Sequence, residues 1–188
     1  MNDQGAFLTT EQFSMFKDFY DNDSAELVDW ENLGSIEEVD DALNKHVDLI
    51  CSEIDISPIQ KSNLNVLIDA NNGTDALANP ILLDRLGINY TIINEKADGR
   101  FSHDPEPLKE NLAGIISELK NGDYDIGFVQ DADADRLVIL DENGHFIGED
   151  YSLALCIDYV LGYEEETVNN KQVVVNLSTS NVINYICE

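Results

Sequence analysis

Short apolar runs alternate with longer amphipathic stretches through the middle of the chain. Four runs are rich in β-branched residues, bounded by turn residues and short enough to be buried strands. They cover residues 64–70, 88–93, 126–130 and 137–140. Helical patterns separate the first three runs, which makes those strands parallel, whereas a short loop makes the fourth strand antiparallel to the third. This order predicts an α/β fold with a mixed, mostly parallel four-stranded sheet flanked by helices.

Two helices are predicted between these strands. The first ends at a left-handed cap, Gly87. It begins either at Thr74, with Pro80 inside it, or at Pro80 itself, with Asn79 as the N-cap. The second helix covers residues 108–119 and places leucine and isoleucine side chains on one face.

Further helices are predicted on both sides of the sheet segment. Two capping-box patterns, Thr9–Gln12 and Ser35–Glu38, predict one helix with an aromatic face and a second that runs to about Ile54. A polar linker at residues 60–63 follows. Beyond the fourth strand the pattern predicts these elements in order: a returning hairpin segment at 145–147, a helix at 151–161, an acidic linker at 162–170, a strand at 172–177 and a helix from Ser180.

The loop between the third and fourth strands carries the candidate chemistry. Asp131, Asp133 and Asp135 occupy alternate positions and Arg136 follows. The carboxyl end of the third strand and the turn at residues 71–73 lie at the same edge of the sheet, where open α/β sheets bind ligands. Three close carboxylates repel one another unless a cation lies among them, and hard oxygens without cysteine or histidine favour Mg²⁺ or Ca²⁺ over zinc. The alternative is a solvated acidic turn.

Composition and charge limit the kinds of molecule that this protein is expected to bind. The chain has 188 residues, 43% of them hydrophobic, which is enough for a packed core, and a net charge of −28. Such a charge argues against nucleic acid and anionic membranes as partners. The three cysteines show no metal-ligand or redox spacing, and no apolar run approaches about 18 residues, so we expect a cytoplasmic protein. The acidity is either ordinary variation or an adaptation to high salt.

The segment Asp131-Ala-Asp133-Ala-Asp135-Arg136 resembles the metal loop of the α-D-phosphohexomutases, the phosphoglucomutase and phosphomannomutase family. The usual loop reads Asp-Gly-Asp-Ala/Gly-Asp-Arg, and Ala132 replaces its glycine. The resemblance covers roughly residues 64 to 165, including the segments 67–73, 98–101, 105–107, 111–112, 143–144 and 148–150. It implies the fold of the second domain of these enzymes.

The resemblance also implies a division of the chain. Residues 1–57 are similar to the tail of a first domain with its connecting helix, residues 58–166 to the metal-loop α/β domain, and residues 167–188 to the start of a third α/β domain. Members of the family use a loop from each of four domains. This sequence lacks a Ser-His-Asn-Pro-like loop, which carries the phosphoryl group, and the Gly-Glu-x-Ser-Gly and Arg-x-Ser-Gly-Thr patterns. We therefore expect an internal fragment that is inactive by itself.

In such an enzyme, Asp131, Asp133 and Asp135 would hold Mg²⁺ together with a phosphoserine oxygen. Arg136 would be catalytic, adding positive charge beside the transferring phosphate. The implied reaction is intramolecular phosphotransfer between hexose 1-phosphate and hexose 6-phosphate, with a phosphosugar as the substrate of the full-length protein. Other interpretations stay open: Arg136 as a structural salt bridge to the loop carboxylates, and the chain as a degenerate mutase remnant or a non-catalytic Mg²⁺- or Ca²⁺-binding α/β module. An EF-hand would need glycine where Arg136 stands.

Overall fold

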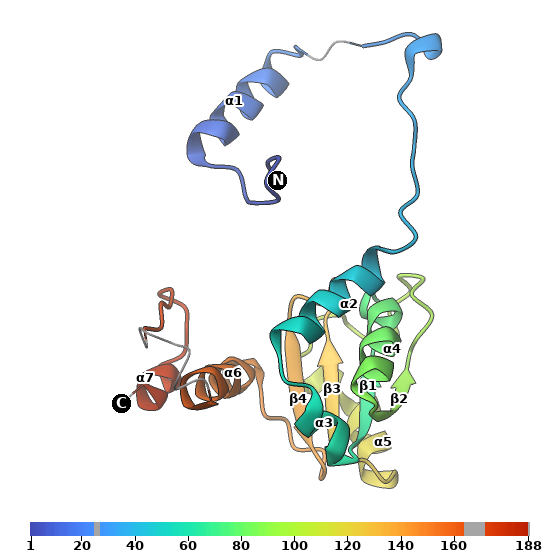
Figure 1. Cartoon of the computed structure of the whole chain (residues 1–188), viewed down its shortest axis with the longest axis vertical. Helices are drawn as coiled ribbons and strands as arrows, with labels where there is room; N and C mark the ends of the chain where they lie inside the picture. Colours follow the sequence, from blue (N-terminus) through green and yellow to red (C-terminus); the bar gives the residue numbers. More distant parts are fainter. Residues whose placement is uncertain (25–26, 164–171, 188) are drawn as a thin grey trace. The chain divides into compact units, whose positions relative to one another are not determined.

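The computed structural model describes residues 1–24, 27–163 and 172–187. The chain forms two compact units, Met1–Val39 and Asp40–Glu188 (Figure 1). The first unit contains α1 (Thr10–Asp21) and the 3₁₀ turn η1 (Trp30–Asn32). The helices of the second unit are α2 (Ala42–Glu53), α3 (Ser57–Ser62), α4 (Asp75–Leu86), η2 (Lys109–Asn111), α5 (Ala113–Asn121), α6 (Glu149–Tyr163) and α7 (Val182–Ile186).

The sheet lies in the second unit. Its strands are β1 (Asn65–Asp69), β2 (Asn89–Ile93), β3 (Ile126–Gln130) and β4 (Leu137–Asp141), in the order β2-β1-β3-β4. β1 pairs in parallel with β2 and β3, and β3 pairs antiparallel with β4. The predicted α/β class and the mixed, mostly parallel sheet are confirmed.

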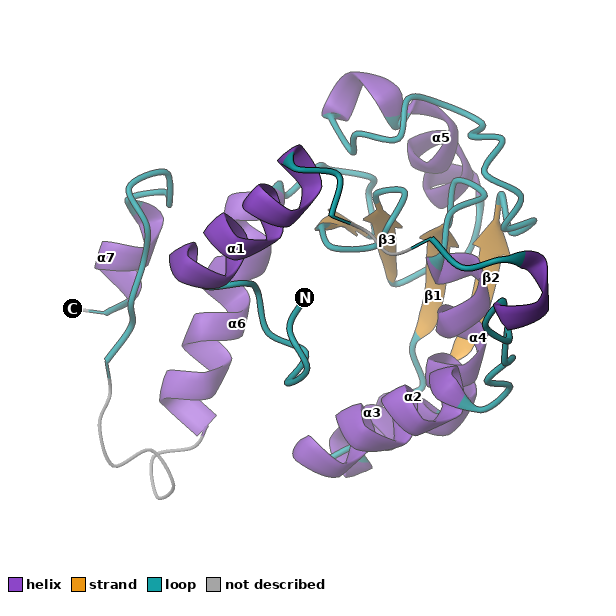
Figure 2. Cartoon of the chain, turned by 90° about the horizontal axis from the view of Figure 1, so that it is seen from above, coloured by secondary structure: helices purple, strands orange, loops and turns teal. Residues whose placement is uncertain are grey.

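Helices cover both faces of this sheet. Successive residues of each strand point to opposite faces, so apolar side chains on both faces must be buried. Figure 2 shows α5 on one side of the strands and α4 with α2 on the other. Leu67 on β1 and Val129 on β3 are buried with Leu112, Ile115 and Leu119 on the α5 side. The neighbouring strand positions Val66 and Ile68 are buried with Leu83 on the α4 side.

Helix α4 resolves the two predicted starts. It begins at Asp75, with Thr74 as its N-cap, so Pro80 lies inside the helix. Gly87 ends it in the left-handed region, with φ 64°, and its N–H donates to the carbonyls of Leu83 and Asp84. The close of this helix therefore matches the sequence pattern, and the proline is accommodated in the helix interior.

The predicted second capping box is wrong as a helix start. Helix α2 begins at Ala42, and Ile36 is 97% exposed. Helices are held mainly by burial of their apolar face, and Val47 is the α2 residue that is buried. The predicted polar linker is also wrong: residues 57–62 form α3, with Pro58 in the first turn and Asn63 as a left-handed cap.

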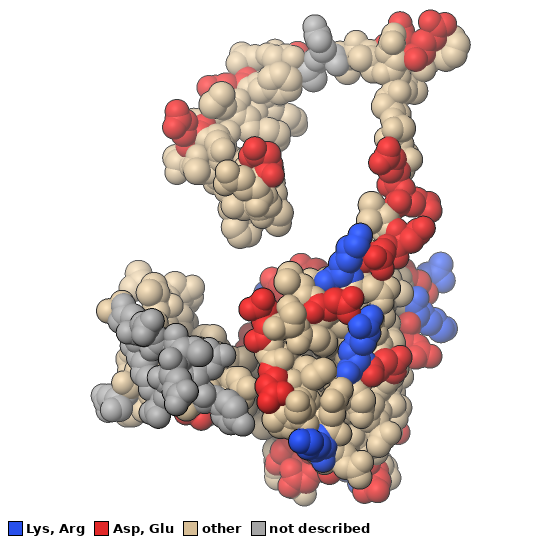
Figure 3. Space-filling model, in the orientation of Figure 1, with Lys and Arg blue, Asp and Glu red and all other residues tan. Residues whose placement is uncertain are grey.

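Helix α1 confirms the first capping box. The Thr9 hydroxyl accepts from the Gln12 N–H at 3.2 Å, and the Gln12 side chain accepts from the Thr9 N–H at 3.0 Å. Its aromatic residues Phe13, Phe16 and Tyr20 are more than half exposed, so the packing expected of this face is not formed by the described residues. On the face shown in Figure 3, acidic side chains lie over both units, whereas the visible basic side chains lie on the second.

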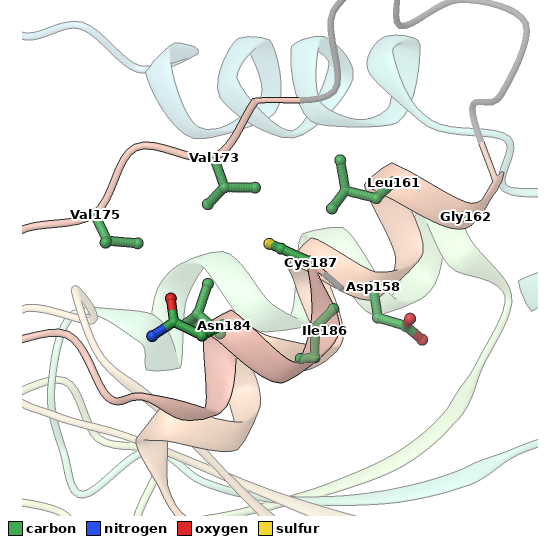
Figure 4. A pocket seen from close by; sticks show the side chains of 9 residues that line it. Asp158, Leu161, Gly162, Val173, Val175, Asn184, Ile186 and Cys187 are labelled. Carbon is green, nitrogen blue, oxygen red and sulfur yellow. The ribbon is translucent and has the colours of Figure 1, made fainter.

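The segment after β4 differs in part from the prediction. Helix α6 forms, and a single bridge joins Leu140 to Phe146 instead of a full hairpin strand. Residues 172–176 pair with no strand among the described residues, and a pocket of about 390 Å³ lies between them, α6 and α7 (Figure 4). The acidic linker expected at 162–170 and the domain boundary expected at 166/167 fall largely or wholly on residues 164–171, outside the described residues.

No helix in the described parts of the chain combines the length and the apolar character needed to cross a bilayer. The predicted three-part division of the chain stays a prediction.

Candidate metal centre

The loop between β3 and β4 brings the three predicted aspartates together. One carboxylate oxygen from each of Asp131, Asp133 and Asp135 lies within 4.8 Å of the other two. The side chain of Asp131 is 12% exposed, whereas that of Asp135 is 73% exposed. The loop therefore presents a carboxylate cluster that is anchored in the fold at one end and open to solvent at the other.

Backbone geometry aims these side chains. The Asp131 carboxylate accepts from the Arg136 N–H at 3.1 Å, and the Asp131 carbonyl accepts from the Ala134 N–H at 3.1 Å. Ala134 has φ 63°, a left-handed conformation that alanine adopts at a cost, whereas Ala132 does not have a positive φ. The strained position of the loop is therefore Ala134.

The turn after β1 contacts this loop and is hydrogen-bonded to it. The Thr74 N–H donates to the Ala132 carbonyl at 3.2 Å. A Cβ on Gly73 would lie 2.9 Å from that carbonyl oxygen and 3.2 Å from the Ala70 carbonyl oxygen. Glycine at this position therefore allows the turn and the metal loop to approach closely.

The long loop at residues 94–107 is tied to the same turn. The buried Asn71 side chain accepts from the Ser102 N–H at 2.7 Å and from the His103 N–H at 3.2 Å. Asn72 donates to the Arg100 carbonyl at 2.7 Å. The side chain of His103 is 18% exposed, and its Nε2 lies 3.1 Å from Asp69. The loop is therefore a packed excursion.

Arg136 has its shortest ionic contact outside the metal loop. Its Nη1 lies 3.1 Å from Glu106 Oε1, whereas its Nε lies 3.6 Å from Asp131 and 3.9 Å from Asp135. The hydrogen bond to Glu106 raises the pKa of Arg136, so the guanidinium stays charged. Its side chain is 47% exposed, which leaves it accessible to a ligand.

The neighbouring carboxylates of the loop raise the pKa of Asp135. A hydrogen bond to Asp131, which only the protonated acid can donate, raises the pKa of Asp135, and the charges of Asp133 and Asp131 act in the same direction. A bound cation would reverse this effect because it favours the ionised carboxylates. The donor set of three carboxylates, without cysteine or histidine, fits a hard divalent cation such as Mg²⁺.

Asp75 is a polar residue behind this loop that the sequence pattern did not single out. It is 2% exposed, its Oδ1 has no hydrogen-bond partner among the described residues, and its Oδ2 accepts from Asn79 at 3.3 Å. Asn79 also donates to Gln130, the residue before Asp131, at 2.8 Å. Burial raises the pKa of Asp75 to about 6. In the sequence this residue resembled an ordinary acid in the first turn of a helix.

A comparison with protein families matches residues 44–144 to the description "Phosphoglucomutase/phosphomannomutase, alpha/beta/alpha domain II". The matched range contains the four strands, α4, α5 and the metal loop. It therefore includes Asp131, Asp133, Asp135 and Arg136 with the elements that support them.

Individual relatives agree with this match. A phosphoglucomutase/phosphomannomutase of Thermococcus kodakarensis is 31% identical over 185 residues, which are 98% of this chain and 40% of the relative. A probable phosphoglucosamine mutase of Methanopyrus kandleri is 32% identical over 183 residues, 97% of this chain and 39% of the relative. A crystal structure of a phosphoglucomutase/phosphomannomutase family protein from Burkholderia thailandensis matches with a TM-score of 0.67 and 28% identity, covering 85% of this chain and 33% of that chain. The chain spans about 40% of the length of the curated relatives it matches.

Proposed function

Because this chain belongs to the phosphoglucomutase/phosphomannomutase family, we propose that it forms the Mg²⁺-binding part of a phosphohexomutase. The proposed reaction interconverts a hexose 1-phosphate and a hexose 6-phosphate by intramolecular phosphotransfer. Its relatives carry the names phosphoglucomutase, phosphomannomutase and phosphoglucosamine mutase, which supports a phosphomutase reaction. The observation that carries the proposal is the cluster of three loop carboxylates beside an accessible guanidinium.

In this proposal Asp131, Asp133 and Asp135 hold Mg²⁺ through carboxylate oxygens. Bound Mg²⁺ supplies neutralisation of the charge on phosphate oxygens, which is the main requirement of phosphoryl transfer. The partly buried Asp131 fixes the position of the site relative to the sheet, because its carboxylate also accepts from the Arg136 backbone. Asp133 and Asp135 are exposed and can adjust to the ion.

Arg136 is proposed to bind phosphate oxygens of the substrate. A guanidinium presents two parallel N–H groups that match a phosphate, and it is always charged. Local positive charge matters in this protein because its net charge of −28 repels an anionic phosphosugar. We propose a phosphosugar as the partner, in the cytoplasm, with no role for nucleic acid or membrane.

The test of the metal site is titration calorimetry of Mg²⁺ into the chain and into an Asp133→Asn variant. Asp123→Asn, which removes the same charge from an exposed position away from the loop, is the matched control. We expect the control to bind like the parent chain and Asp133→Asn to lose at least about tenfold in affinity, because one inner ligand is weakened. Equal isotherms for all three proteins would remove the metal assignment.

A mutase assay on the chain by itself tests the proposal that this chain supplies the metal site and not the serine that carries the phosphoryl group. We expect no conversion of glucose 1-phosphate to glucose 6-phosphate, even with a sugar bisphosphate primer, because the sequence has no serine loop of the kind that carries the phosphoryl group. Conversion by the pure chain would show that another residue accepts the phosphoryl group.

A further inference from the structure

We propose that Glu106 is a positioning residue of this metal centre, which keeps the Arg136 guanidinium off the loop aspartates. The aspartates then stay available to a cation, and the guanidinium stays available to a phosphate. The inference rests on the proposed Mg²⁺ site and concerns how the arginine beside that site avoids occupying it. Glu106 lies 30 residues before Arg136, in the long loop at residues 94–107.

The first observation is the order of distances. The Arg136 side chain donates a hydrogen bond to Glu106 at 3.1 Å. Its approaches to Asp131 and Asp135, at 3.6 and 3.9 Å, are longer than a normal hydrogen bond. A structural counter-ion of the loop carboxylates would show the opposite order. The guanidinium therefore forms its hydrogen bond with Glu106, although two aspartates lie close to it.

The second observation is the rigidity of the residue that carries this carboxylate. The Glu106 N–H donates to Asp104 at 3.1 Å, and the Glu106 carbonyl accepts from the Leu108 N–H and the Asn111 side chain, each at 2.8 Å. Prolines flank it on both sides, and the second, Pro107, is fully buried. An exposed ion pair normally gains little because both side chains must be ordered. Here the backbone of one partner is already held.

The third observation is competition for charge. Arg136 lies within 4.0 Å of two of the carboxylates that would ligate a cation. An arginine that moved fully onto these carboxylates would occupy the same oxygens and lower their affinity for Mg²⁺. Glu106 offers the guanidinium a different acceptor at the edge of the site. Its effect on the metal should therefore pass through Arg136 and not through its own charge alone.

A double-mutant cycle separates these two routes. Mg²⁺ affinity is measured by calorimetry for the parent chain, Glu106→Gln, Arg136→Gln and the double variant, with the exposed Glu110→Gln as a control for loss of one negative charge. We expect Glu106→Gln to weaken Mg²⁺ binding roughly threefold to fivefold, a range set by the usual strength of exposed ion pairs. In the Arg136→Gln background, the same change should have less than about a twofold effect, as should Glu110→Gln.

Equal weakening in both backgrounds would reduce Glu106 to a general source of negative charge and overturn the proposal. Unchanged or tighter binding by Glu106→Gln would overturn it as well. Thermal melts of all five proteins check that the loop remains folded. Glu106→Asp, which keeps the charge, should restore part of the lost affinity.

A metal-free measurement distinguishes this inference from the function it rests on. All proteins are compared without Mg²⁺ by NMR. Relative to the parent chain, the Nε–Hε resonance of Arg136 should shift in Glu106→Gln and stay unchanged in Glu110→Gln. An unchanged Arg136 resonance would refute the positioning role. If the resonance shifts but the parent chain binds no Mg²⁺, the Glu106–Arg136 contact stands, while the proposed metal site, and with it the purpose assigned to the contact, fails.

Discussion

Asp75 should make this protein less stable as the pH rises toward neutrality. The residue is 2% exposed behind the metal loop, and one of its carboxylate oxygens finds no hydrogen-bond partner in the described part of the chain. Burial raises its pKa from 3.8 to about 6. The folded state therefore binds the proton more tightly than the unfolded state does. Stability from this group is complete below pH 3.8 and is lost as the pH rises through about 6.

The size of the loss follows from the two pKa values. The difference between 3.8 and about 6, at 1.36 kcal/mol for each pKa unit, gives about 3 kcal/mol above pH 7. An Asp75→Asn variant keeps the shape of the side chain and cannot ionise. It should be more stable than the parent chain by about 1.6 kcal/mol at pH 5 and by about 3 kcal/mol at pH 7.5.

The assay is urea unfolding followed by circular dichroism, in EDTA, between pH 5 and pH 7.5. This range stays above the sequence isoelectric point of about 4.1. Asp123→Asn, at an exposed position, measures what removal of one negative charge contributes in so acidic a protein. The difference between Asp75→Asn and this control should grow by about 1.4 kcal/mol across the range and level off above pH 7. A difference that is constant with pH would refute the assignment of a buried, proton-binding carboxyl.

Three further changes test the loop and the charge. Gly73→Ala should lower the free energy of unfolding by about 1–3 kcal/mol, because its Cβ would meet the Ala132 carbonyl. The control Gly114→Ala has open space around it and should cause no loss of stability. Equal urea midpoints for the two variants would contradict the close approach at Gly73. Ala134→Gly should stabilise the protein by up to about 1 kcal/mol, because the φ angle of Ala134 is 63°. Ala132→Gly should destabilise the protein by about 0.5–1 kcal/mol, because Ala132 does not have a positive φ. Urea unfolding that ranks the two variants the other way would contradict the loop geometry. With a net charge of −28, the melting temperature should rise between 0.1 and 2 M KCl as the Debye length falls from about 10 Å toward 3 Å and below; a flat profile would refute a high-salt adaptation.

The strands were predictable because their signal is local. The four apolar runs match β1 to β4 within one residue at each end. The clearest case is β1, which is buried on both faces and therefore has few polar positions. Their directions followed from connection length alone. The start of α2 was not predictable from Ser35 to Glu38, because a capping box stabilises a helix only where the following apolar residues find a partner. Ile36 and Val39 find none among the described residues and stay exposed.

The site divides in the same way. Asp131, Asp133 and Asp135 adjoin one another in the sequence, so their proximity could be predicted from a single loop. Glu106 and Asp75 reach this loop from segments 25 or more residues away, and neither shows a periodic pattern. Their roles depend on which side chains the folded backbone brings together. The contact between His103 and the buried Asp69 has the same origin, because it joins residues that are 34 positions apart in the sequence.

The position of the acidic loop also bears on how the chain folds. Gln130 and Leu137 are paired across this loop, whereas β1 pairs Asn65 with Asn89 and Val66 with Ile126. The β3–β4 hairpin is therefore the strand pair whose formation costs the least loop-closure entropy. On that ground we expect it to form first during folding. A hairpin that forms first would, however, bring three carboxylates together in its turn before the other strands could pair. Refolding should consequently accelerate with ionic strength more steeply than unfolding slows, so that most of the stabilisation by salt appears in the folding rate.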